Sequence, residues 1–264
     1  MKKIFAIKHK NSFTLLAVIS LMVANPVFAS DIEREQRMAA EIVDSLLDGD
    51  AVYLQADERQ FLTIYTEAEK AKGSVIILHG RGFHPDWQDA INPMRVGLVE
   101  SGWNTLSVQM PVLHKQAKYY DYVPLFPEAI PRIEAAIAYL REHNKGSKVV
   151  LIGHSCGAHM AMMWADTESF ESIDAYVGLG MGATDYKQPM KHDFPLEKIQ
   201  APMLDIYAEN DYPAVLEMAV KRWAGIQRAG NNKSRQVVVK NADHYYVDQG
   251  EALTEVISRW LDSL

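Results

Sequence analysis

The chain has 264 residues and a formal net charge of −7. This length is sufficient to bury a sizeable core, and the acidic balance disfavours nucleic acid and anionic membrane surfaces as partners. Cys156 is the single cysteine, which excludes an internal disulfide, and no metal-ligand spacing, P-loop or dinucleotide fingerprint is present. We therefore expect neither a metal nor a cofactor.

Residues 1–29 have the pattern of an export signal. Lysines precede an apolar run at residues 13–24, and small residues at Val27 and Ala29 place a cleavage site after Ala29. The run is shorter than the roughly 20 residues that span a bilayer, which favours cleavage over an uncleaved membrane anchor. Loss of the four lysines of this segment takes the formal charge from −7 to about −11. We expect residues 30–264 to form a single domain, periplasmic or secreted, without a stable membrane anchor.

The remaining chain alternates between helical and strand-like patterns. In chain order the expected elements are helix 31–47, strands 51–55, 61–67 and 74–79, helix 90–100, strand 104–110, helix 128–142, strand 148–153, helix 158–165, strands 175–180 and 203–207, helix 214–224, strand 236–240 and helix 252–264. This order predicts an α/β fold with a mostly parallel central sheet and helices on both faces. Only about twenty residues, 181–200, separate two of the strands where a lid would insert, so we expect little or no lid.

The pentapeptide from Gly153 to Gly157 has the form G-x-S-x-G, with Ser155 at its centre. Alone this is a weak signal, but here an apolar strand precedes it and a helix follows. A tight turn between the two exposes the serine hydroxyl above the sheet, and glycines avoid crowding in such a turn. Ser155 is therefore the predicted nucleophile, and an ordinary strand–helix turn is the alternative.

A serine hydroxyl needs a base, and the base needs an acid to orient it. His244 follows the last strand, and Asp211 follows an earlier one. The resulting order, Ser155, Asp211, His244, is that of a strand–turn–helix serine hydrolase. Glu209 is the alternative acid, whereas Asp205, inside its strand, is expected to be structural.

The remaining acids and histidines are expected to have no catalytic role. Asp243 is expected to be a solvated loop carboxylate next to His244. His159 and His192 are expected at the surface, and an exposed loop position is the alternative for His244 itself.

Acyl transfer also needs backbone N–H groups directed at the oxyanion. One is expected from Cys156, directly after the nucleophile, and the other from Arg81, with Gly82 as the close alternative. The Cys156 thiol is expected to fill space, and His79 to be packed and hydrogen-bonded.

The resemblance to a known family rests on four segments: His79-Gly80, Gly153–Gly157, Asn210-Asp211 and Asp243-His244. Together they resemble the α/β-hydrolase superfamily across nearly the whole of residues 30–264. More narrowly, residues 82–87 and 102–111 resemble a bacterial family of exported α/β-hydrolase-like proteins of undefined function. The resemblance implies the α/β-hydrolase fold and acyl transfer, and it implies no substrate.

Several side chains are candidates for the substrate pocket. They either follow the oxyanion loop or belong to the aromatic segment 113–126: Gly82, Phe83, His84, Trp87, Tyr119 and Tyr120. Packing of the aromatic residues into the core is an equally good interpretation. The side chain of Arg81 is a candidate for binding a substrate carboxylate, or else an exposed arginine without a role.

The sequence thus predicts an exported serine hydrolase that acts on a small-molecule ester, thioester or amide, with small esters favoured. The alternative is a non-catalytic envelope binding or assembly protein that uses the same fold. A peptidase is a third and weaker hypothesis. The oligomeric state is not predicted.

Overall fold

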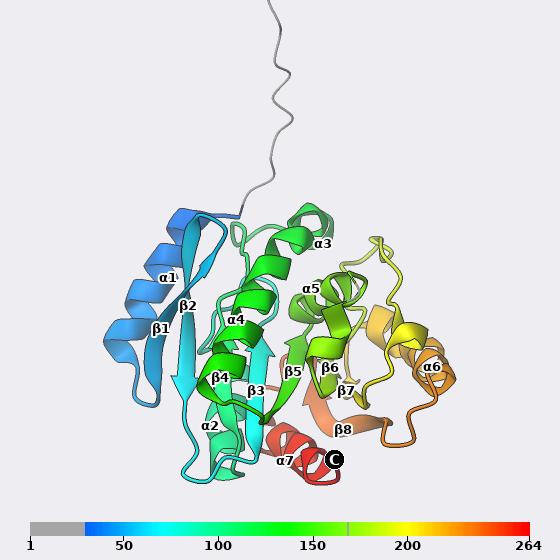
Figure 1. The fold of residues 1–264 in the computed structure, drawn as a ribbon. Coiled ribbons are helices and arrows are strands. Elements are labelled where there is room, and N and C mark those ends of the chain that lie inside the picture. Colours follow the sequence, from blue (N-terminus) through cyan, green and yellow to red (C-terminus); the bar gives the residue numbers. More distant parts are fainter. Residues whose placement is uncertain (1–29, 168) are drawn as a thin grey trace, which may run out of the picture.

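The computed structural model describes residues 30–167 and 169–264, so the expected leader at 1–29 lies outside the described residues. The strands are β1 (Asp50–Ala56), β2 (Arg59–Thr66), β3 (Gly73–Leu78), β4 (Asn104–Val108), β5 (Lys148–His154), β6 (Ala175–Leu179), β7 (Met203–Asn210) and β8 (Arg235–Asp243). They form one sheet in the order β1-β2-β4-β3-β5-β6-β7-β8 (Figure 1). The β1–β2 and β2–β4 pairs are antiparallel and all other neighbours are parallel. The predicted mostly parallel sheet is confirmed.

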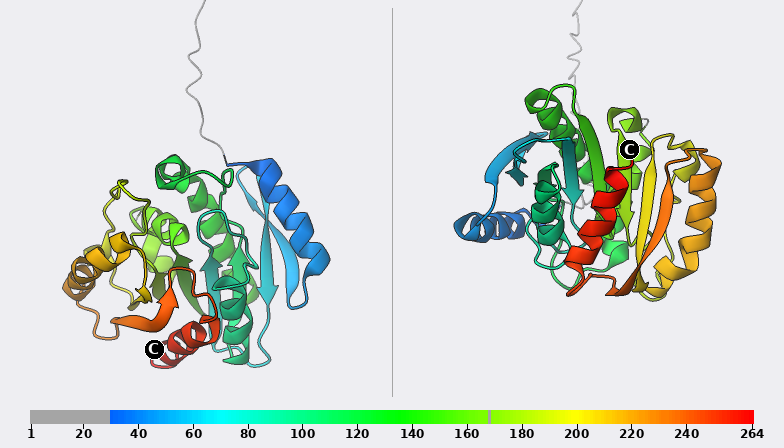
Figure 2. Two further views of the ribbon diagram at one scale, coloured as in Figure 1. Left: turned by 180° about the vertical axis from the view of Figure 1, so that it is seen from behind. Right: turned by 90° about the horizontal axis from the view of Figure 1, so that it is seen from below.

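Helices cover both faces of this sheet. They are α1 (Ile32–Ser45), α2 (Ile91–Glu100), α3 (Tyr119–Tyr122), α4 (Ile130–His143), α5 (Cys156–Ala165), α6 (Pro213–Arg228) and α7 (Gly250–Leu261), with 3-10 helices at Val123–Ala129, Ser169–Ser172 and Leu196–Lys198. Figure 2 shows α1, α2 and α7 on the side of the sheet opposite α4 and α5. Within the described ranges, no helix is long and apolar enough to cross a bilayer.

The central strands are apolar on both faces because both faces are covered. In β5, Val149 and Leu151 pack into the cluster that contains α4 and α5, whereas Val150 and Ile152 pack into the cluster that contains α2 and α7. This two-sided burial explains why the strand is a continuous apolar run rather than an alternating one.

The parallel strands place the candidate site at one edge of the sheet. β3, β5, β6, β7 and β8 all run in the same direction, so the loops that follow them meet at the same edge. This edge is where open parallel sheets bind ligands. The described chain between β6 and β7 contains a single 3-10 turn, Leu196–Lys198, and no inserted lid domain.

Some element boundaries differ from expectation. α5 begins at Cys156 instead of residue 158, and β8 extends to Asp243, which was expected in a loop. The segment 113–126 contains α3 and part of a 3-10 helix. It folds locally because Tyr122 and Phe126 are buried in the α4–α5 side of the core.

A buried ion pair joins α6 to β7. The Arg222 guanidinium donates to the Asp205 carboxylate at 3.0 Å, and the two side chains are 1% and 0% exposed. Arg222 also donates to the carbonyls of Met181 and Val215, and Gln236 donates to Asp205. Asp205 is therefore structural, as expected from its place inside the strand.

We predict that Arg222→Met destabilises the fold strongly, because it leaves the Asp205 carboxylate buried without its counter-charge. The expected loss in the free energy of unfolding is about 3–5 kcal/mol. The matched control is Lys221→Met on the same helix, whose pair with Asp193 is 73% and 85% exposed. Its expected loss is below about 1 kcal/mol. Urea unfolding measures the free energy of unfolding of both variants, and equal losses would contradict the structural role of the Arg222–Asp205 pair.

Candidate active site

Ser155 occupies the sharp turn between β5 and α5, with φ 53° and ψ −114°. A Cβ atom at Gly157 would lie 2.5 Å from the Leu78 carbonyl oxygen and 2.6 Å from that of His79. At Gly153 it would lie 2.8 Å from the Cα of Ala158. Both glycines are therefore needed for the turn, which lifts the serine hydroxyl above the end of the sheet.

Three loops bring Ser155, His244 and Asp211 into one hydrogen-bonded chain. The Ser155 hydroxyl donates to His244 Nε2 at 2.8 Å, and His244 Nδ1–H donates to Asp211 Oδ1 at 2.6 Å. His244 is 2% exposed, so the exposed-loop alternative does not describe it. These contacts have the geometry of a nucleophile, a base and an orienting acid.

Asp211 is held in its charged form. Burial is the largest single influence and would raise the pKa of this carboxyl, but the hydrogen bond and the charge of His244 and the backbone N–H groups of Ala208 and Tyr212 together outweigh it. Its pKa therefore lies below the ordinary value. An ionised carboxylate at this position fixes the tautomer of His244 and stabilises a proton on it.

The rival acids are engaged elsewhere. Glu209 accepts from Lys240 at 2.8 Å and from the Asn241 N–H at 2.9 Å. Asp243 accepts from the N–H groups of Tyr245 and Val247, which orders the turn that follows β8. Neither carboxylate contacts the His244 ring.

The expectation that His159 is a surface residue is wrong. It is 3% exposed, lies against the rings of Tyr119 and Phe126, and donates from Nε2 to the Ala183 carbonyl at 3.0 Å. Burial lowers its pKa to about 4, so it is neutral. His192 is exposed, as expected.

The loop after β3 approaches the nucleophile turn closely. A Cβ atom at Gly80 would lie 3.0 Å from His154 Nδ1 and 3.3 Å from the Cβ of Ser155. The N–H groups of Arg81 and Cys156 donate to no other group within the described part of the chain. Both are thus free to donate to an oxyanion at Ser155.

Two residues of this region are inert. His79 donates from Nδ1 to the Gly80 carbonyl and accepts at Nε2 from the Met110 N–H, and burial lowers its pKa to about 3. It is a packed residue that fixes the loop, as expected. Burial raises the pKa of the Cys156 thiol to about 12, which keeps it protonated and unreactive.

Four residues that surround His244 were not anticipated from the sequence. The Tyr212 ring stacks on the imidazole with 4.2 Å between the ring centroids. The Tyr245 ring lies at an angle of 74° to the imidazole, with 5.4 Å between the centroids. His154 donates from Nε2 to the His244 carbonyl at 2.9 Å. A Cβ atom at Gly180 would lie 2.8 Å from His244 Cε1. The imidazole is therefore confined on several sides.

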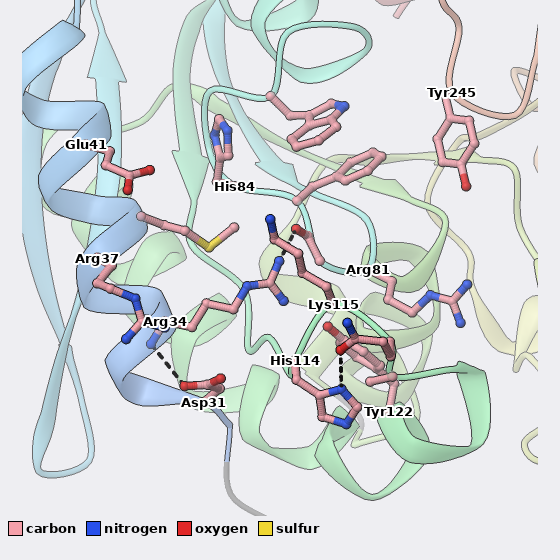
Figure 3. A pocket seen from close by; sticks show the side chains of 16 residues that line it. Asp31, Arg34, Arg37, Glu41, Arg81, His84, His114, Lys115, Tyr122 and Tyr245 are labelled. Atoms are coloured by element: carbon pink, nitrogen blue, oxygen red, sulfur yellow. Dashed lines mark hydrogen bonds between the residues drawn. The ribbon is translucent and has the colours of Figure 1, made fainter.

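Two cavities adjoin this site. A small one of about 20 Å³ touches Ser155 and is lined by Arg81, Tyr119, Ser155, Cys156, Ala183, Thr184 and Tyr212. A larger groove of about 920 Å³ lies beside it, and its lining includes Gly82, Phe83, His84 and Trp87 (Figure 3). Tyr120 lines neither of them, and its ring packs against the Lys191 ammonium.

The Arg81 side chain is already paired. Its guanidinium donates to both carboxylate oxygens of Asp185, a residue of the loop after β6. Asp185 also accepts from the Tyr119 N–H. Among the described residues, no group of three or more His, Cys, Asp or Glu side chains is arranged to hold a metal ion.

The order of the strands, the turn that carries Ser155 and the hydrogen bonds from Ser155 through His244 to Asp211 are those of the α/β-hydrolase fold. Similar solved structures share this fold. One is an alpha-beta serine hydrolase homologue from Coxiella burnetii (18% identity, TM-score 0.60, covering 81% of this chain and 98% of that one). Another is dienelactone hydrolase from Anabaena variabilis (20% identity, TM-score 0.63, 81% and 96%). A third is the esterase Pf2001 from Pyrococcus furiosus (16% identity, TM-score 0.65, 84% and 95%).

The sequence also matches a family model over most of its length. Residues 23–122 and 127–263 match the family described as "Protein of unknown function (DUF3530)", and the chain belongs to this family. A search of curated proteins finds no match to the chain.

Gly180→Ala is predicted to displace His244. Gly180 has φ +57° and no room for a methyl group, because the imidazole it would meet is held by Asp211 and Tyr212. We expect the far-downfield proton resonance of the His244–Asp211 hydrogen bond to shift or vanish in the NMR spectrum. Gly230→Ala is the matched control, since Gly230 has φ +80° and open space around it. Both changes carry about 1–2 kcal/mol of backbone strain, so the two variants differ in the contact with His244. An identical resonance in both would contradict the close approach of Gly180 to His244.

Proposed function

We propose that this chain is an exported serine hydrolase that cleaves short-chain carboxylic esters. The observation that carries the proposal is the continuous chain from the Ser155 hydroxyl through His244 to the Asp211 carboxylate, at 2.8 and 2.6 Å. Three side chains from separate loops meet within hydrogen-bond distance in the order that acyl transfer requires. The names of the similar structures agree with this class of reaction.

In the first half-reaction, Ser155 Oγ forms a bond to the acyl carbon while its proton passes to His244 Nε2. The carbonyl oxygen becomes an oxyanion that accepts from the backbone N–H groups of Cys156 and Arg81. Each such donor contributes about 3–4 kcal/mol to the transition state. His244 then gives the proton to the alcohol oxygen, and the bond between that oxygen and the acyl carbon breaks.

In the second half-reaction, water replaces the alcohol. His244 accepts a proton from the water, whose oxygen bonds to the acyl carbon, and returns a proton to Ser155 Oγ as the acid leaves. Asp211 remains ionised throughout and stabilises the imidazolium that forms twice in each cycle. Its lowered pKa suits this role.

A short acyl group fits the cavity at Ser155. About 20 Å³ has room for roughly one group the size of a water or methyl. The side chains of Tyr119 and Tyr212 line the cavity, and both are held by hydrogen bonds: the Tyr119 hydroxyl accepts from the Lys191 N–H, and the Tyr212 hydroxyl is bonded to that of Tyr245. Acetyl and similarly short acyl groups are therefore preferred to long acyl chains.

Export forms part of the proposal and rests on the sequence of residues 1–29. In that case residues 30–264 act outside the cytoplasm, where the absence of paired cysteines leaves the fold dependent on its core.

The alternative, a binding or assembly protein without catalysis, has one observation in its favour. The cavity at Ser155 is small, and a site filled by side chains suits a protein that has no substrate. The short distance between Ser155 and His244 favours the hydrolase, because a non-catalytic protein has no need to maintain it.

Substitution of Ser155 separates the two functions. With phenyl acetate as substrate, we predict that Ser155→Ala lowers kcat by about 10⁴-fold or more. Asp211→Asn is expected to lower it by about 10³–10⁴-fold, because the imidazole loses its orienting acid. Ser263→Ala is the matched control: it removes an exposed serine hydroxyl that follows α7, away from the residues that line the Ser155 cavity, and should leave kcat unchanged. Wild-type activity that survives Ser155→Ala would contradict the proposal.

The acyl chain provides a second prediction. Phenyl octanoate is expected to give a kcat/KM at least about tenfold below that of phenyl acetate, since extra methylene groups must displace packed side chains. Steady-state hydrolysis of the two phenyl esters measures this directly. A preference for the octanoate would show that the cavity at Ser155 does not receive the acyl group.

A further inference from the structure

The groove beside the Ser155 cavity lies between α1 and the loop after β3 (Figure 3). Helix α1 contributes Arg34 and Arg37, the segment after β4 contributes Lys115, and the loop after β8 contributes Tyr245. Its volume of about 920 Å³ is ample for a small organic molecule.

The groove and the Ser155 cavity meet at side chains that line one or both of them. Arg81 lines both cavities, so its side chain stands at their boundary. Tyr245 lines the groove and Tyr212 lines the Ser155 cavity, and their hydroxyls are hydrogen-bonded to each other. An ester with a small acyl group in the Ser155 cavity would therefore extend its alcohol portion towards the groove.

The groove gathers four cations, and two of them are paired with acids that lie outside its lining. The lining contains the cations Arg34, Arg37, Arg81 and Lys115 and the acids Asp31 and Glu41. Asp185 pairs with Arg81, and Glu33 pairs with Arg37.

Two of these cations have no acidic partner. The Arg34 guanidinium donates only to the backbone carbonyls of Leu113 and Gly82, and Arg34 is half-buried. Within the described part of the chain, neither Arg34 nor Lys115 forms an ion pair. Figure 3 shows both side chains extending into the middle of the groove. A guanidinium and an ammonium placed in this way suit an oxyanion ligand.

An aromatic wall lies next to these charges. The rings of Phe83 and Trp87 stack at 4.1 Å with an angle of 4° between their planes, and the Tyr245 ring is 5.7 Å from Phe83. Flat apolar surface beside unpaired cations suits an organic anion better than an inorganic one.

We infer that the groove binds a carboxylate or phosphate carried by the alcohol portion of the substrate, with Arg34 and Lys115 as its ligands. The substrate class is then a short-chain acyl ester of an anionic alcohol or phenol. This inference rests on the proposed function and adds to it. Ser155 takes the acyl group, His244 protonates the leaving oxygen, and the anionic fragment departs through the groove.

The test compares two esters that differ in charge. One is 4-acetoxybenzoate, whose leaving group carries a carboxylate, and the other is its neutral methyl ester. We expect kcat/KM to favour the anionic ester by about tenfold at low salt, although the neutral ester has the better leaving group. The preference should fall in 1 M salt, where the screening length is only about 3 Å.

Arg34→Gln and Lys115→Gln should each lower the ratio of kcat/KM for the anionic ester to kcat/KM for the neutral ester by at least about threefold. The ratio cancels any change that Arg34→Gln causes in the loop at Gly82, to which Arg34 donates. Lys145→Gln is the matched control, because Lys145 is exposed in the turn between α4 and β5, at the opposite edge of the sheet. A preference that survives both groove variants would overturn the assignment. A kcat/KM for phenyl hydrogen succinate, which carries the anion on the acyl side, above that for 4-acetoxybenzoate would also overturn it.

Failure of the inference is distinguishable from failure of the proposed function. If both esters are hydrolysed at equal rates, the groove assignment fails and the hydrolase stands. If neither is hydrolysed, the proposed function fails, and calorimetry on Ser155→Ala still tests the groove. That variant should bind 4-hydroxybenzoate more tightly than its methyl ester, and Arg34→Gln should remove the difference; equal binding overturns the inference.

Discussion

The close approach of α5 to the end of β3 is the constraint on which the site depends. The Leu78 and His79 carbonyls leave no space for a side chain at Gly157, and Ser155 reaches its position only through a backbone with positive φ. Because the same approach brings the loop at Gly80 against the Ser155 turn, Ser155 and Cys156 lie next to the loop that carries Arg81. Packing between a strand and a helix thus determines how closely the Ser155 turn and the loop after β3 approach each other.

The imidazole of His244 is fixed by a different set of contacts. Asp211 holds the imidazole of His244 at Nδ1, the Tyr212 ring covers one face, and Gly180 allows the ring to lie directly over the end of β6. His154, the neighbour of the nucleophile, donates to the His244 carbonyl and so ties the two loops together. Burial lowers the pKa of His154 to about 4, which keeps this link neutral. The positions of Ser155 and His244 are therefore coupled through the backbone as well as through their own hydrogen bond.

Local pattern was enough to predict the elements, the parallel sheet and the order Ser155, Asp211, His244, because each depends on short-range periodicity and on the ends of strands. The partners of these residues depend on contacts between distant segments. Nothing near Arg34 in the sequence indicates that α1 lies against the loop at Gly82, and Tyr212 and Gly180 carry no motif. The error at His159 was avoidable, since α5 is apolar on all sides, a pattern that indicates a fully buried helix.

Every step of the proposed reaction requires Ser155 to be an activated nucleophile. Peptide mapping by mass spectrometry after treatment with a fluorophosphonate tests this claim most directly, because the reagent reports the nucleophile without any assumption about substrate. We predict a single adduct on the peptide that contains Ser155, absent from Ser155→Ala and much slower to form in His244→Gln. A folded wild-type protein that takes no adduct, or takes it at another residue, would contradict it.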